Sequence, residues 1–111
     1  MKKKLKIFWL SYDLGLKGDY ENLYSWLDNH EAKECGDSLA VFKKGVNGDY
    51  IKEITSDLKK NVNFNKTDRV YLIYFDETTG GMKGKFIIGN RKRSPWQGYG
   101  WTVEEEVAED F

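Results

Sequence analysis

The chain is poor in the residues that build disulfide frameworks and metal centres. Its 111 residues include one cysteine, Cys35, and one histidine, His30. A single cysteine excludes an internal disulfide and a zinc site made of several cysteines, and it suits a reducing compartment. A single histidine excludes, within one subunit, a nuclease that uses a pair of histidines as general acid and general base.

The chain also lacks net charge and long apolar runs. Its 18 lysines and arginines balance its 18 acidic residues, so only local basic patches could attract nucleic acid. No apolar run is long enough to span a bilayer. The basic start resembles a signal peptide, but Lys6, Ser11 and Asp13 interrupt the apolar segment that follows. We therefore expect a cytoplasmic protein that does not bind membranes.

Aromatic residues are abundant, at 15 % of the chain, and the segment 5–12 contains several of them. A half-exposed strand alternates apolar with polar residues, whereas this segment has large apolar residues at both odd and even positions. We therefore expect a central strand that is covered on both faces. The odd and even positions hold, respectively, Leu5, Ile7 and Trp9, and Phe8, Leu10 and Tyr12.

The remaining pattern predicts one α+β domain with a ferredoxin-like βαββαβ order, an added strand and a C-terminal tail. Asp19 is a suitable N-cap for a first helix, and Gly48-Asp49-Tyr50 opens a second. Gly45 is expected to end a strand. The domain covers residues 1–111, with a core over about 5–89 and a tail over about 90–111. Further strands are expected at 32–35, 38–42, 70–75 and 85–88, and a last helix at 102–111.

The expected topology brings three acidic segments together. The first strand lies between the third and fourth core strands and antiparallel to both, so Asp13, Asp37-Ser38 and Asp68-Arg69 gather at one rim. Helices cover only one face of such a sheet. The other face carries large side chains and needs a partner, and a homodimer through the sheet face is the simplest solution.

Short motifs in a defined order carry a resemblance to a known family. They are Ser11-Tyr12-Asp13-Leu14 at the end of the first strand, the helix start Asp19 to Tyr24, and the strand openings Asp37-Ser38 and Asp68-Arg69. With these motifs, over roughly residues 5–76, the chain resembles the small CRISPR-associated ferredoxin-like nuclease and integration-subunit family, and more closely its SinR-like relatives. It differs from the CRISPR branch at residues 15–21, which hold one cation and two acids instead of an arginine-rich segment.

The resemblance implies a role for Asp13. In that family the acid that ends the first strand faces the dimer mate, and a divalent metal binds between the two copies. Some members cleave RNA or DNA with metal help, and others are non-catalytic adaptors. The dimer is built through sheet faces, often with exchange of a terminal strand, which would be Lys85 to Ile88 here.

The rim residues can be interpreted either as a catalytic metal site or as structural residues. Mg²⁺ or Mn²⁺ would take the carboxylate of Asp13, with Asp68 as a further ligand, and would polarise a phosphodiester and activate water. Ser38 would orient a ligand or a phosphate, and Arg69 would stabilise phosphate charge. The candidate catalytic residues are thus Asp13, Ser38 and Arg69. In the structural interpretation Asp13 caps a loop and Arg69 forms a salt bridge with Asp68 or another neighbour.

A basic and aromatic segment follows the last strand. Arg91, Lys92 and Arg93 precede Trp96, and cations interleaved with aromatic residues suit single-stranded nucleic acid. The alternative is that Trp96, Tyr99 and Trp101 pack on the domain or on its mate.

Three functions stay open from the sequence. The first is a homodimer that cleaves or binds nucleic acid at its axis with a metal at Asp13. The second is a non-catalytic dimeric interaction module, and the third is a toxin-type ribonuclease of similar fold.

Overall fold

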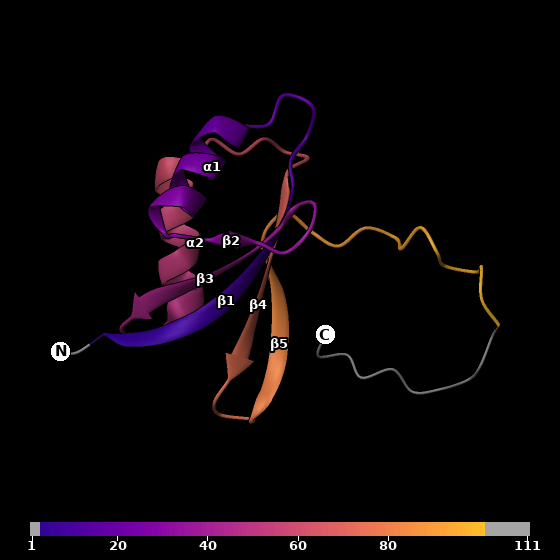
Figure 1. Ribbon diagram of the computed structural model, residues 1–111. Coiled ribbons are helices and arrows are strands. Elements are labelled where there is room, and N and C mark those ends of the chain that lie inside the picture. The colour runs from indigo at the N-terminus through magenta and orange to yellow at the C-terminus, as the bar shows by residue number, and fades with distance from the viewer. Residues whose placement is uncertain (1–2, 102–111) are drawn as a thin grey trace.

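The computed structural model describes residues 3–101, in which two helices pack on one face of an antiparallel sheet (Figure 1). The prediction of an α+β fold is confirmed, with the element order βαββαββ. The expected helix at 102–111 lies outside the described residues. Within those residues no helix is long and apolar enough to cross a membrane. The strands are β1 (Lys4–Asp13), β2 (Lys33–Glu34), β3 (Leu39–Val46), β4 (Arg69–Asp76) and β5 (Gly81–Ile88), and the helices are α1 (Tyr20–Asn29) and α2 (Tyr50–Asn61).

Strand β1 lies in the middle of the sheet, as its sequence predicts. The strand order is β2-β3-β1-β4-β5, and β1 is antiparallel to both of its neighbours. Phe8 and Leu10 face the helices and are 0 % exposed, whereas Leu5 is 66 % and Ile7 46 % exposed on the other face. The helices therefore cover one face, and the face that carries the odd residues of β1, called the open face below, is uncovered in the monomer.

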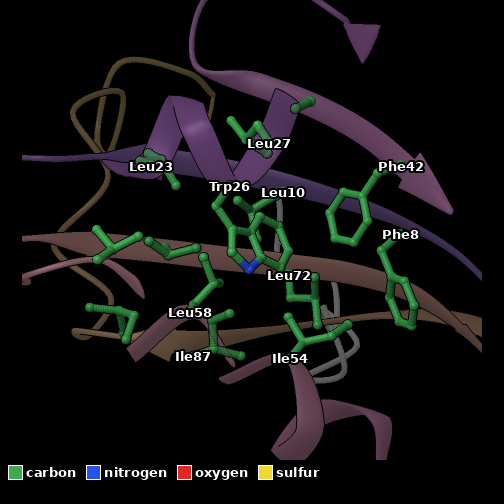
Figure 2. Close-up of a cluster of buried hydrophobic side chains, with 14 of the residues drawn as sticks. Phe8, Leu10, Leu23, Trp26, Leu27, Phe42, Ile54, Leu58, Leu72 and Ile87 are labelled. Carbon is green, nitrogen blue, oxygen red and sulfur yellow. The ribbon is translucent and has the colours of Figure 1, made fainter. Parts of the chain in front are cut away.

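Local sequence explains where both helices begin. Asp19 and Asp49 cap them, and each side chain accepts a hydrogen bond from a backbone N–H three residues later. The apolar stripe of each helix then packs on the even side of β1 and β4. Trp26 lies at the centre of this core (Figure 2), and its indole Nε1 donates to Oδ2 of Asp57 at 2.8 Å, which ties α1 to α2.

Two strand boundaries were predicted wrongly. Gly45 does not end β3, because pairing with β1 continues to the pair Lys4–Val46. Strand β5 begins at Gly81 and not at Lys85, because it pairs with the whole of β4 as far as Asp76. In both strands, hydrogen bonding to a long neighbour outweighs the weak strand preference of glycine.

The pairing of β4 with β5 contains a β-bulge. Tyr71 pairs with Phe86 and Val70 pairs with Ile88, so Ile87 is an extra residue on β5. Ile87 and Ile88 are consecutive and both are buried. In regular alternation Ile88 would instead lie on the open face, beside Arg69.

Candidate functional site

A hollow of about 380 Å³ lies on the open face, where β1 ends and β4 begins. It is lined by Ser11, Asp13, Arg69, Tyr71, Phe86 and Arg91, and we call it the arginine–aromatic pocket. The register of the strands brings most of the lining residues together, because residues that pair directly lie side by side on the same face. Its size falls within the ~300–1,000 Å³ typical of small-ligand sites.

Asp13 and Arg69 form an ion pair at the rim of this pocket. Arg69 Nη2 donates to Asp13 Oδ2 at 2.7 Å. The Asp13 side chain is 61 % exposed, so the pair adds at most ~1 kcal/mol to stability. Within residues 3–101, Asp13 Oδ1 has no hydrogen-bond partner, and the buried Nε of Arg69 has none either. The pair therefore presents carboxylate acceptors and guanidinium donors side by side.

The wall of the pocket consists of two aromatic rings with a guanidinium group over them. The rings of Tyr71 and Phe86 meet edge to face with their centroids 4.7 Å apart. Arg91 Cζ lies 5.5 Å from the centroid of Tyr71 and 5.3 Å from that of Phe86, within the range of cation–π attraction. The ring of Tyr71 also lies over Gly84, where a Cβ atom would collide with it. The absence of a side chain at Gly84 thus makes room for this wall.

Asp68, the second expected metal ligand, lies next to Arg69 in the chain but is 1 % exposed. Its Oδ1 accepts from the Gly15 N–H at 2.8 Å and its Oδ2 from the Asn65 N–H at 2.6 Å. The carboxylate thereby holds together the loops that precede α1 and β4. Because Asp68 is buried, a metal could reach its carboxylate only if the surrounding loops moved apart. The structure describes no group of three or more His, Cys, Asp or Glu side chains, within residues 3–101, that could hold a metal ion.

Ser38 lies beside the end of β1 but does not line the pocket. It is exposed with φ of 65°, and its carbonyl accepts from the Tyr12 N–H at 3.0 Å. The predicted gathering of Asp13, Ser38 and Arg69 at one rim is therefore confirmed at the level of the backbone. Tyr12 itself faces the helices, where burial raises the pKa of its phenol.

The basic tail divides into two parts. Arg91 folds over the pocket, whereas Lys92, Arg93 and Trp96 are exposed on a segment that runs away from the sheet (Figure 1). Trp96 is 72 % exposed, and Tyr99 and Trp101 are more exposed still. The expectation that these aromatic residues pack on their own domain is therefore wrong, and packing on a mate stays a prediction.

The opposite half of the open face is mostly apolar, although the exposed Lys43 pairs with Ile7 there. Exposed side chains from three neighbouring strands gather there, and we call them the apolar patch: Leu5, Ile7, Phe75 and Met82. Phe75 pairs directly with Met82. The open face thus combines an apolar half with a charged and aromatic half.

Sequence reasoning missed Ser11, Tyr71 and Phe86 as site residues. Tyr71 could have been found, since strand alternation places it on the same face as Arg69. Phe86 required the register of β5, which the sequence does not provide.

A comparison of the chain with models of known protein families, with curated proteins and with solved structures found no match.

Proposed function

We propose that this protein is a homodimer that binds single-stranded nucleic acid, RNA or DNA, in the arginine–aromatic pocket. The observation that carries this proposal is the position of the Arg91 guanidinium over Tyr71 and Phe86, beside a second guanidinium, that of Arg69. Guanidinium groups pair with phosphates, and aromatic faces on a sheet stack with bases of any sequence. Lys92, Arg93 and Trp96 extend this chemistry along the tail.

The strand order supports a ferredoxin-like architecture for this dimer. Leaving β5 aside, the order β2-β3-β1-β4 with a helix after β1 and another after β3 is the arrangement expected of that fold. On this basis the resemblance to the CRISPR-associated and SinR-like group is part of the proposal.

The apolar patch is the proposed dimer contact. Contiguous exposed apolar surface on a sheet is typical of protein interfaces, and a second copy offers a matching surface across a two-fold axis. Replacing Ile7 with glutamate should convert the dimer to a monomer in sedimentation. Leu16→Glu, at an exposed position in the loop between β1 and α1, is the control and should leave the dimer intact. A wild-type monomer would contradict the contact.

Binding is tested by fluorescence anisotropy with labelled single-stranded RNA and DNA at several salt concentrations. Phe86→Leu should weaken binding by about 5- to 150-fold through loss of base stacking. Arg91→Gln should weaken binding for all sequences. It should also reduce the slope of log affinity against log salt concentration by about one. Lys60→Ala, an exposed charge on the helical layer, is the control. Equal affinities for Arg91→Gln and Lys60→Ala would reject the pocket as the site.

Metal-dependent cleavage at Asp13 is the second candidate function. It is favoured by the exposure of this carboxylate and by its unpartnered Oδ1 in the described part of the chain. A dimer axis parallel to β1 would bring two Asp13 side chains to the same end of the dimer, where Mg²⁺ or Mn²⁺ would bind between them. Arg69 and Ser38 would then act on the phosphate. An axis across the strands would separate the two carboxylates.

Cleavage is tested by incubating labelled RNA and DNA with Mg²⁺, Mn²⁺ or a chelator. We expect metal-dependent products from the wild type, none from Asp13→Ala, and wild-type yield from Asp28→Ala, an exposed control on α1. Products that persist in Asp13→Ala would remove Asp13 from the mechanism. A dimer that neither binds nor cleaves nucleic acid would support the non-catalytic interaction module instead.

A further inference from the structure

We propose that the ion pair of Asp13 and Arg69 reads guanine, so that the arginine–aromatic pocket selects a guanine base within the bound strand. This inference rests on the proposed function and adds base selectivity to it. The structural basis is the order of hydrogen-bonding groups at the pocket rim, two carboxylate oxygens followed by guanidinium N–H groups.

The groups of the ion pair match one base edge in particular. A carboxylate oxygen has two lone pairs, so Asp13 Oδ2 can accept a further bond while it holds Arg69, and Oδ1 has no partner among residues 3–101. Arg69 has five N–H donors, of which Nη2 uses one on Asp13. The rim therefore offers acceptor, acceptor and donor in sequence.

Guanine is the base that complements this order. Its Watson–Crick edge carries the N2 amine and the N1–H as adjacent donors, followed by the O6 acceptor. Adenine would direct its N1 lone pair at the carboxylate, and uracil has a single donor between two acceptors. Cytosine has one donor beside two acceptors. Only guanine places two donors opposite Asp13 and an acceptor opposite Arg69, as proteins do when they read an extruded or unstacked base on this edge.

The pocket wall suits a base held in this way. Phe86 and Tyr71 rise from the strands next to the ion pair, and Arg91 lies above both rings. A purine ring would stack on these rings when the Arg91 guanidinium swings outward to pair with the phosphate of the same nucleotide. Edge recognition, stacking and phosphate pairing thus have separate side chains within one hollow.

The test compares short oligouridylates that carry one central guanosine, inosine or adenosine, measured by competition against a labelled strand. The guanosine strand should bind about tenfold more tightly than the adenosine strand. Inosine, which lacks the N2 amine, should fall between them. Asp13→Asn replaces one acceptor with a donor and should bring the guanosine-to-adenosine ratio close to one, while Lys60→Ala keeps the wild-type ratio. Free guanosine and adenosine monophosphates show whether a nucleotide outside a strand is selected as well.

The outcomes separate this inference from the proposed function. Wild-type binding to all strands with equal affinity would overturn the guanine assignment and leave nucleic-acid binding intact. A guanosine preference that persists in Asp13→Asn would also overturn it, because the carboxylate would not be the reading group. Failure of every strand to bind would reject the proposed function together with the inference. Selection of the free monophosphate without selection in the strand would overturn the claim that the base is read within a polymer.

Discussion

Replacing Asp68 with alanine should destabilise the fold strongly, although the residue lies beside the candidate site. The substitution removes a carboxylate that is 1 % exposed and leaves the N–H groups of Gly15 and Asn65 without acceptors. A hydrogen bond to a charged group contributes about 1.5–3 kcal/mol, so the loss of two predicts a decrease of about 3–6 kcal/mol in the free energy of unfolding. This is a large share of the ~5–15 kcal/mol that stabilises a typical domain.

Urea denaturation followed by circular dichroism measures this effect. With an m value of about 1.5 kcal/mol per molar, the midpoint for Asp68→Ala should fall by about 2 M or more. The midpoint for Asp68→Asn should fall less, because the amide oxygen still accepts one hydrogen bond. Asp28→Ala, at an exposed helix position, should stay within about 0.5 kcal/mol of the wild type. If Asp68→Ala were as stable as Asp28→Ala, the reasoning that this carboxylate anchors two loops would be refuted.

Two further predictions concern acid stability and the pocket wall. The backbone N–H of Asn63 lowers the pKa of Asp19 below its ordinary value of 3.8, so this group stabilises the fold above that value and the contribution disappears as the pH falls through the folded pKa. Urea midpoints of wild type and Asp19→Asn should therefore converge below about pH 4, and a constant difference would contradict this. Gly84→Val should displace the ring of Tyr71 and cost about 1–3 kcal/mol. Gly81→Val, on the same strand with open space around it, is the control, and equal stability of the two variants would contradict the packing.

Sequence patterns predicted the elements whose signals are local. Large apolar residues at both odd and even positions predicted that β1 is a central strand, because the alternation of side chains between the two faces is a property of the strand itself. Asp19 marked the start of α1, since its side chain caps the helix from the adjacent turn. The predicted topology was then enough to place Asp13 next to Arg69, and the register of β1 with β4 confirms this.

Features that depend on pairing partners could not be predicted from the sequence. Gly45 and Gly81 are weak strand residues, and only the lengths of β1 and β4 keep them in the sheet. The approach of Arg91 to Tyr71 and Phe86 depends on the path of the chain after β5 ends at Ile88, which has no clear signature in the sequence.

The short connection between β5 and Arg91 makes the charge of the pocket a matter of chain length as well as residue identity. Strand β5 ends at Ile88, and Arg91 reaches the ring of Phe86 from only three residues further on, after Gly89 with its φ of 75°. Insertion or deletion of one residue between Ile88 and Arg91 would keep every pocket residue in the sequence and yet change the position of the second guanidinium. A chain of this kind can thus gain or lose a cation at its binding surface by a change in spacing, without substitution of any residue that lines it.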